Sequence, residues 1–320
     1  MPVKVAVLDD YQSVAEGYGA WAELGGALEL ELFHDHVADL ELLAERLAPF
    51  EVVVAMRERT RFPRALLERL PALRLLVSTG MGTAHIDVAA TRELGIVVSG
   101  TRGSGRGPAE LTWALILGLA RHVVEEDATI RAGGWQRTVG RDLADATLGI
   151  VGLGQIGKQV AAIGQAFGMQ VIAWSQNLDA PAAAALGVEP VDKETLLRSA
   201  DVLTVHVRLS ERTRGLISAR DLALLRPTAL VVNTSRGPII DEGALVDGLR
   251  AGRIGGAGLD VFEHEPLPLD HPLRSAPRTI LTPHIGYVTE RGYRAFFGDA
   301  VEDIAAFVAG APLRVLNQAG

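Results

Sequence analysis

The chain has 320 residues and a formal net charge of −8, and 48% of its residues are hydrophobic and 22% charged. This composition is typical of a globular protein, and the length suits two domains. No run of lysine or arginine occurs, so we expect no binding to nucleic acid or to an anionic membrane surface. The sequence contains no cysteine, which excludes disulfides, thiolate nucleophiles and zinc sites with cysteine ligands.

No segment predicts secretion or a membrane span. The N-terminal residues MPVKVAVLDDYQ lack the long apolar core and the cleavage site of a signal peptide. The apolar stretch 111–120 is shorter than the roughly 20 residues that cross a bilayer, and we interpret it as a buried helix. We expect a cytoplasmic protein that does not bind membranes, and we predict no metal site.

The first hundred residues alternate short apolar runs with amphipathic stretches. We expect strands at 4–8, 52–56, 73–78 and 96–99, and helices at 38–47 and 63–70. This alternation predicts a parallel sheet with helices on both faces. The glycine-rich segment 101–108 then indicates a crossing between domains, and a helix over 109–122 follows it.

A second alternating series begins near residue 147, after an irregular arm that contains Trp135. Trp135 suits either an interface or the wall of a cleft. We expect strands at 148–151, 170–174, 202–207, 229–233, 256–260 and 279–282, and helices at 155–167, 192–199, 218–224, 241–250 and 291–308. This rhythm predicts a six-stranded, doubly wound sheet.

We therefore predict an α/β protein with two doubly wound domains. One domain, residues 101–287, is inserted into the other, which is made of residues 1–100 and 288–320. The chain crosses between these domains twice. Such a connection forms a natural hinge, so we expect the cleft to close on substrate.

A glycine pattern marks the start of the second series. Gly152, Gly154 and Gly157 form G-x-G-x-x-G between an apolar strand and a helix, which is the context that dinucleotide binding requires. The three glycines allow a tight turn, a close approach to pyrophosphate and close packing of helix on strand. The helix then begins at Gln155 and Ile156, where unpaired N–H groups favour phosphate. The alternative is an ordinary tight turn between strand and helix.

The end of the next strand bears on the choice between NAD and NADP. An acidic residue commonly stands there and binds the ribose hydroxyls of NAD. Here the chain continues with Ser175, Gln176 and Asn177, so nothing repels a 2′-phosphate. No arginine follows immediately to bind one, however, and Asp179 would supply the acid if the strand ended later. We expect NAD, with NADP nearly as well supported.

Three further segments follow predicted strands, and ligands of open α/β sheets bind outside the carboxyl ends of strands. VVNTSRG places Arg236 after one strand, GLDVFEHEP places Asp260 and Glu265 after the next, and LTPHIG places His284 after the last. Each residue also has a structural alternative, as a surface ion pair, a solvated carboxylate or a core histidine. Glu263 could be mistaken for Glu265.

These ordered motifs resemble the D-isomer-specific 2-hydroxyacid dehydrogenases. The matching segments are GLGQIG, NTSRG, LDVFEHEP and PHIG; TGMGTAHID (79–87) is similar to the substrate loop of the family, and AELTWALILGLAR (109–121) to its long helix. Two positions depart from the family pattern. Ser175 stands where aspartate is usual, which leaves the cofactor open. Val207-Arg208 stands where Cys-Pro or Leu-Pro is common, which reshapes the adenine pocket.

The resemblance implies an oxidoreductase that transfers a hydride between NAD(P) and a small D-2-hydroxy acid or 2-keto acid. It implies that residues 101–287 form a Rossmann-type NAD(P)-binding domain and that residues 1–100 and 288–320 form a flavodoxin-like substrate-binding domain. His284 would act as the general acid/base, and Glu265 would hydrogen-bond its imidazole and fix its tautomer. Arg236 would bind the substrate carboxylate through its two-pronged guanidinium. Asp260 would bind the nicotinamide carboxamide, and Thr234 would line the ring.

The same resemblance implies further contacts. The backbone N–H groups of Met81 and Gly82 would hold the substrate carboxylate, and Arg57 could meet a second anionic group. Val207 and Thr213 complete the expected cofactor contacts, together with Ser175. Relatives are dimers, so we expect a homodimer.

Two other functions remain open. A relative that oxidises formate or phosphonate shares this fold, but those that oxidise formate carry glutamine in place of Glu265. A non-catalytic, NAD(H)-sensing binding protein of the same fold could retain all three catalytic residues. Measurable turnover would distinguish an enzyme from such a sensor.

Overall fold

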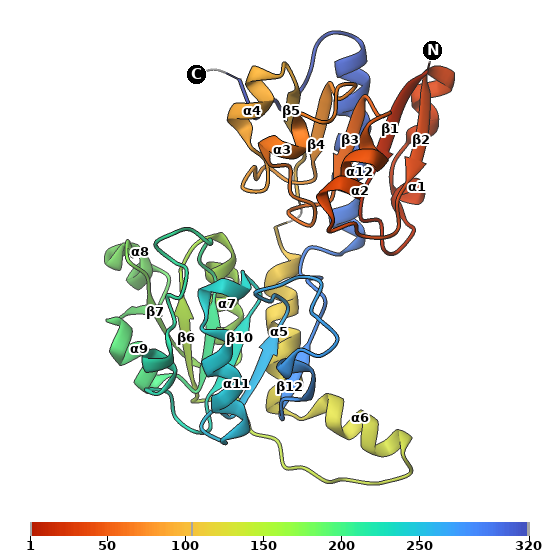
Figure 1. Ribbon diagram of the computed structural model, residues 1–320. Coiled ribbons are helices and arrows are strands. Elements are labelled where there is room, and N and C mark those ends of the chain that lie inside the picture. Colours follow the sequence, from red (N-terminus) through yellow and green to blue (C-terminus); the bar gives the residue numbers. More distant parts are fainter. Residues whose placement is uncertain (1, 104, 319–320) are drawn as a thin grey trace. The chain divides into compact units, whose positions relative to one another are not determined.

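The computed structural model describes residues 2–103 and 105–318 (Figure 1). The chain forms two compact units, one of Met1–Ser104 with Val288–Gly320 and one of Gly105–Tyr287. Each unit is described by itself below. Among the described residues, no helix combines the length and the apolar character that a membrane span needs.

The first unit contains a five-stranded parallel sheet in the order β2-β1-β3-β4-β5, which is the flavodoxin-like order that we predicted. Its strands are β1 (Val3–Val7), β2 (Leu28–Leu32), β3 (Val52–Ala55), β4 (Leu75–Ser78) and β5 (Val97–Gly100). Its helices are α1 (Ala15–Tyr18), η1 (Trp21–Ala27), α2 (Leu40–Leu47), α3 (Arg64–Leu67), α4 (Val88–Glu93) and α12 (Glu290–Val308). The central strands β3 and β4 are wholly buried, as continuous apolar runs predict.

The second unit contains a seven-stranded parallel sheet in the order β12-β11-β10-β9-β6-β7-β8. This is the doubly wound Rossmann order with one further strand at the β12 edge. The strands are β6 (Thr147–Val151), β7 (Gln170–Trp174), β8 (Glu189–Pro190), β9 (Val202–Val205), β10 (Leu230–Asn233), β11 (Gly256–Leu259) and β12 (Thr279–Leu281). The predicted count of six strands was wrong, because β8 is a two-residue edge strand too short to give a pattern.

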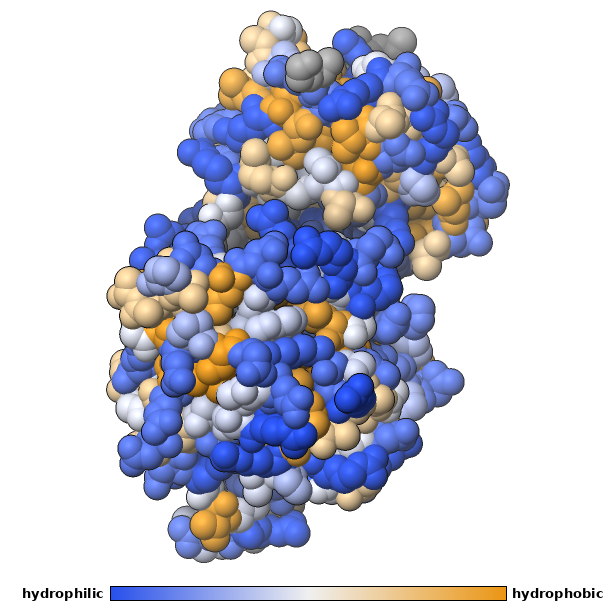
Figure 2. Space-filling view, turned by 90° about the vertical axis from the view of Figure 1, so that its left-hand side faces the viewer, coloured by the Kyte–Doolittle hydropathy of each residue, from blue (hydrophilic) through white to orange (hydrophobic). Residues whose placement is uncertain are grey.

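Helices cover both faces of this second sheet. They are α5 (Gly107–Ala120), α6 (Val123–Arg131), α7 (Gln155–Ala166), α8 (Ala180–Ala185), α9 (Lys193–Ser199), α10 (Ala219–Leu222), η2 (Gly237–Ile239), α11 (Glu242–Arg250) and η3 (Pro272–Ser275). The apolar α5 is buried against the sheet, as predicted; Trp113 and Ile116 lie in one core cluster with strand residues Leu148 and Ile150. The side of the unit that carries α8 and α9 is largely hydrophilic, with smaller hydrophobic areas (Figure 2).

Candidate active site

The strands of the second unit end in register at one edge of the sheet. Val151 pairs with Trp174 and with Val205, and the same register continues through Asn233 to Leu259 and Leu281. The residues that directly follow the strand ends therefore form one row along the carboxyl edge. Their order is Thr282, Asp260, Thr234, His206, Gly152 and Ser175. Ligands of open α/β sheets bind outside this edge.

The glycine turn at the centre of this row fits a dinucleotide. Gly152 has φ +97°, and a Cβ there would lie 2.6 Å from Val207 Cγ1. A Cβ at Gly157 would lie 2.2 Å from the carbonyl oxygen of Gly152, so close packing of α7 on the turn requires glycine. At Gly154, by contrast, a Cβ would meet no atom of the described residues within 4 Å. The open side of Gly154 therefore leaves space for a pyrophosphate at the N-terminus of α7.

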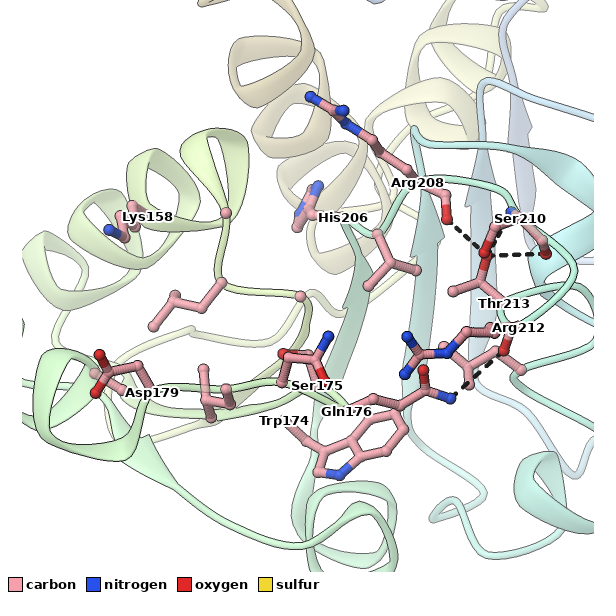
Figure 3. A pocket seen from close by; sticks show the side chains of 18 of the residues that line it. Lys158, Trp174, Ser175, Gln176, Asp179, His206, Arg208, Ser210, Arg212 and Thr213 are labelled. Carbon is pink, nitrogen blue, oxygen red and sulfur yellow. Dashed lines mark hydrogen bonds between the residues drawn. The ribbon is translucent and has the colours of Figure 1, made fainter. Parts of the chain in front are cut away.

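A pocket of about 440 Å³ opens beside the glycine turn (Figure 3). This volume lies within the usual range for sites of small ligands. Five of the ten residues predicted to bind the cofactor line the pocket, namely Gly152, Gly154, Ser175, Val207 and Thr213. The other five, which are Gln155, Ile156, Gly157, Thr234 and Asp260, lie outside its lining. The pocket lies beyond the ends of β7 and β9, where the adenosine end of a dinucleotide binds in doubly wound sheets.

Several residues of the pocket were not predicted from the sequence. They include Lys158 on α7, Trp174 and Gln176 at the end of β7, and Arg212 in the loop after β9. That loop is held by the Thr213 hydroxyl, which donates to the carbonyl of Arg208 at 2.6 Å and accepts from the Ser210 N–H at 2.8 Å. Trp174, Gln176 and Arg212 lie at or beyond the ends of β7 and β9, and this position in the sequence could have identified them as pocket residues.

His206 also lines the pocket, at the end of β9. Its Nε2 lies 2.9 Å from the Thr204 hydroxyl. Burial lowers the pKa of His206 to about 4, so the imidazole is neutral at physiological pH. His206 therefore contributes a polar wall to the pocket and no positive charge.

His284 and Glu265 meet directly at the other end of the row. The imidazole Nδ1 donates to Glu265 Oε2 at 2.6 Å, and Glu265 Oε1 accepts from the Phe262 N–H at 2.9 Å. His284 has φ +53°, a left-handed conformation that is uncommon outside glycine and is often found at functional sites. The neighbouring carboxylate of Glu263 instead pairs with Arg214, with 3.8 Å between Glu263 Oε1 and Arg214 Nη1. The histidine predicted for proton transfer is thus paired with the predicted glutamate.

Asp260 fixes the loop that carries His284. The Asp260 side chain is fully buried. Its Oδ1 accepts from the Thr282 hydroxyl at 2.6 Å and from the Ile285 N–H at 2.8 Å, and its Oδ2 accepts from the Gly286 N–H at 2.8 Å. Burial raises the pKa of this carboxyl, against the opposing effect of the three hydrogen bonds. The visible role of Asp260 is therefore to position the loop, and its contact with the nicotinamide stays a prediction.

Arg236 lies in the turn after β10, which is closed by its own hydrogen bonds and packs against the loop after β11. The Asn233 side chain closes the turn, since it donates to the Arg236 carbonyl at 2.9 Å and accepts from the Ser235 N–H at 3.0 Å. A Cβ at Gly237 would lie 2.0 Å from the Phe262 carbonyl carbon, so the turn lies directly against the loop that leads to Glu265. The Arg236 guanidinium donates to the Ser235 carbonyl at 2.6 Å.

The other predicted cofactor and substrate residues have separate surroundings. Thr234 is buried, and its hydroxyl lies 2.8 Å from that of Thr112. In the first unit, Arg57 has φ +54°, and its N–H donates to the Thr79 hydroxyl at 2.8 Å. The Met81 side chain is 57% exposed, and the Gly82 carbonyl accepts from the Ser78 hydroxyl. Substrate contact by Arg57, Met81 and Gly82 stays a prediction.

Within residues 2–103 and 105–318, no group of three or more histidine, aspartate or glutamate side chains could hold a metal ion.

Comparisons with known proteins agree with this arrangement. The family model of the D-isomer specific 2-hydroxyacid dehydrogenase NAD binding domain matches residues 113–286. A glyoxylate reductase of Aeropyrum pernix is 42% identical over 264 residues, which cover 79% of this chain and 79% of that protein. A D-3-phosphoglycerate dehydrogenase of Methanocaldococcus jannaschii is 39% identical over 80% of this chain, but the match spans only 49% of that protein.

Solved structures show the same relationship over nearly the whole chain. The crystal structure of a phosphoglycerate oxidoreductase from Vibrio cholerae O395 has a TM-score of 0.92 at 40% identity, and the match covers 97% of this chain and 100% of that one. The family model and these identities are sufficient to assign the family. The chain belongs to the D-isomer specific 2-hydroxyacid dehydrogenases and is an NAD(P)-dependent oxidoreductase.

Proposed function

We propose that the protein reduces a small 2-keto acid to the D-2-hydroxy acid, with His284 as the proton donor. The observation that carries this proposal is the 2.6 Å hydrogen bond between His284 Nδ1 and Glu265 Oε2 at the carboxyl edge of a Rossmann sheet. Bound NAD(P)H supplies the hydride. Glyoxylate and hydroxypyruvate are the substrates that we favour, because a relative with 42% identity is a glyoxylate reductase and another with 36% is a hydroxypyruvate reductase.

The hydrogen bond to Glu265 determines which ring nitrogen acts. It keeps a proton on Nδ1, so Nε2 is the atom that gives a proton to the carbonyl oxygen in reduction and accepts one in oxidation. The left-handed backbone of His284 and the anchored loop around it hold this nitrogen in a fixed direction. Such preorganisation lowers the entropy that the reacting groups lose in the transition state.

Arg236 would bind the substrate carboxylate. A guanidinium matches the two oxygens of a carboxylate in a planar, two-pronged geometry that the point charge of lysine cannot reproduce. The turn that carries Arg236 is fixed by Asn233 and lies against the loop that leads to Glu265. We further propose that the N–H groups of Met81 and Gly82 hold the same carboxylate and that Arg57 meets a second anionic group of the substrate.

The test is oxidation of NADH and of NADPH with a panel of 2-keto acids, for the wild type and for His284→Ala. We expect turnover in the wild type and a fall of about 10²–10⁴-fold in the variant, with unchanged cofactor binding. His264→Ala is the matched control, because His264 is an exposed residue of the neighbouring loop. Unchanged turnover in His284→Ala would refute the assignment. Cofactor binding without turnover of any keto acid would favour an NAD(H)-sensing protein.

We also propose that the protein is a cytoplasmic homodimer. Support for the dimer comes from α6 and the segment after it, which extend away from the rest of the second unit (Figure 1). Apolar side chains gather there in exposed positions; Trp135 is 73% and Val139 is 93% exposed, and Val124 and Ile130 are about half exposed. Burial of such residues against a second copy would remove apolar surface from water. Light scattering should give the mass of a dimer for the wild type and the mass of a monomer for Trp135→Glu. The proposed cytoplasmic location is tested separately, by cell fractionation.

A further inference from the structure

We propose that the pocket beside Ser175 binds the 2′-phosphate of NADPH and that Arg212 is the principal residue that selects NADPH over NADH. This inference rests on the proposed function only in that it needs a nicotinamide dinucleotide in the second unit. It departs from the narrow preference for NAD that the sequence suggests. Three observations carry it: the residue at the end of β7, the charges that line the pocket, and the position of Arg212.

The end of β7 offers a hydroxyl where an NAD-selective site offers a carboxylate. The register of Trp174 with Val151 identifies Ser175 as the residue that follows the strand. Asp179 does not replace the missing acid, because its carboxylate caps α8 and accepts from the Ala182 N–H at 3.0 Å. In Figure 3, Asp179 also lies on the opposite side of the pocket from Arg212. A 2′-phosphate near Ser175 would thus gain a hydroxyl donor and meet no carboxylate at the strand end.

The charged side chains that line the pocket are mostly cationic. They are Lys158, Arg208 and Arg212, against the single carboxylate of Asp179. Within the described residues, none of these three cations has an ion pair or a side-chain hydrogen bond to a carboxylate. Some other surface arginines of the described chain are paired, such as Arg198 with Glu194 at 2.9 Å, and others, such as Arg220 and Arg250, are not, so the distinguishing feature is that three such cations gather around one pocket. In a protein with a net charge of −8, three unpaired cations around one pocket indicate an anionic ligand.

Arg212 contacts the segment that follows β7. The Gln176 side chain donates to the Arg212 carbonyl at 3.5 Å and so links the loop after β7 to the loop after β9. Figure 3 shows the Arg212 guanidinium beside Gln176, whereas Lys158 lies on α7 across the pocket and Arg208 points away from Gln176. Arg212 is therefore in the best position to reach a phosphate on the ribose carbon that an NAD-selective acid would face.

The loop around Arg212 is already ordered by its own hydrogen bonds. The Thr213 hydroxyl binds the Arg208 carbonyl and the Ser210 N–H, one residue from Arg212. A guanidinium on a fixed loop loses less freedom when it binds phosphate than one on a mobile loop. One charge-assisted contact of this kind corresponds to a change in affinity of about 10- to 100-fold.

The experiment measures binding rather than turnover. The dissociation constants of NADPH, NADH, 2′,5′-ADP and 5′-ADP are determined by fluorescence and calorimetry for the wild type, Arg212→Gln and Ser175→Asp. We expect the wild type to prefer NADPH over NADH, and 2′,5′-ADP over 5′-ADP, by about 10-fold or more. Arg212→Gln should weaken only the two ligands with a 2′-phosphate. Ser175→Asp should weaken the same two ligands because it introduces a negative charge beside the phosphate.

Arg214→Gln is the matched control. Arg214 stands two residues further along the same exposed loop but lies near Glu263, so its loss should leave all four constants unchanged. Tighter binding of NADH in the wild type, or equal weakening of NADH and NADPH in Arg212→Gln, would overturn the inference. Selective binding of 2′,5′-ADP by a protein that reduces no keto acid would support the inference and refute the proposed reaction. Reduction of a keto acid with NADH alone would do the opposite.

Discussion

Asp260→Asn tests whether one buried carboxylate holds the loop of His284 in place. The three donors around Asp260 are the Thr282 hydroxyl and the N–H groups of Ile285 and Gly286, all within 2.8 Å. Asparagine has nearly the same size and keeps one acceptor oxygen. Its amide nitrogen, however, is itself a donor, so it would face at least one of these N–H groups without forming a hydrogen bond.

The expected cost follows from these contacts. A hydrogen bond to a charged group contributes about 1.5–3 kcal/mol, and a buried donor that is left unsatisfied costs about 1–3 kcal/mol. Burial raises the pKa of Asp260, so removal of its charge recovers part of the desolvation cost. If the substitution destabilises the ordered loop by about 2 kcal/mol, the ratio of ordered to disordered loop falls by about 30-fold. We therefore expect kcat to fall by about 10- to 100-fold.

The assay combines kcat for the preferred keto acid, the dissociation constant of the reduced cofactor and the melting temperature. Asp270→Asn is the matched control, because it makes the same change at an exposed carboxylate of the same unit. A lower melting temperature with normal kcat would show that Asp260 supports only the fold and would refute our reasoning. Weaker cofactor binding with normal kcat would show direct contact with the nicotinamide instead.

Three further predictions follow from single contacts. Glu265→Gln removes the charged acceptor of His284 Nδ1, so kcat should fall by about 10- to 100-fold with unchanged cofactor affinity, whereas Glu263→Gln should retain activity; equal loss in both would refute the pairing. Gly154→Ala adds a methyl group in open space and should weaken cofactor binding without lowering the melting temperature; Gly157→Ala, whose Cβ would lie 2.2 Å from a backbone oxygen, should lower it. Burial raises the pKa of Asp303 to about 7, so the folded state binds an extra proton between about pH 4 and 7 and the free energy of unfolding falls as the pH rises through this range. Asp303→Asn should remove up to about 4 kcal/mol of this decline in denaturant titrations at several pH values, and an unchanged slope would contradict the prediction.

The elements that the sequence predicts well are those whose environment is uniform along their length. The buried strands β3, β6 and β10 are mostly apolar, and the tight turn after β6 requires glycine at Gly152 and Gly157. The strand β2 was not predicted, because its sequence LELEL separates the leucines by glutamates and lacks the continuous apolar run of a buried strand. Its alternation is the pattern of a half-exposed edge strand. The helix α6 was not predicted either, because it buries only Thr129, and its apolar residues Val124 and Ile130 are exposed, so no buried apolar face marks it.

The same reasoning explains which site residues were predicted. His284 and Glu265 follow strands whose ends are clear in the sequence, and their pairing needs only that these ends share one edge. Arg212 lies in an irregular loop that no periodicity marks, and its place beside Gln176 depends on contact between two loops 36 residues apart. The anchoring role of Asp260 was hidden for another reason. A carboxylate at a strand end can face a ligand or three backbone and side-chain donors, and only the tertiary structure distinguishes them.

The carboxyl edge of the second sheet has His284 at one end and the pocket beside Ser175 at the other, and the charged groups at these two ends differ in their partners. At the end with His284, the ionisable groups bind one another or the backbone, so each side chain is held in one geometry before substrate arrives. Chemistry that depends on a fixed direction of proton transfer requires this arrangement. At the pocket end, Arg212 and its cationic neighbours have no carboxylate partner in the described chain, so their interaction energy is available to a ligand. Cofactor preference should therefore change with single substitutions in the pocket, while the rate of hydride transfer from whichever cofactor is bound stays nearly constant.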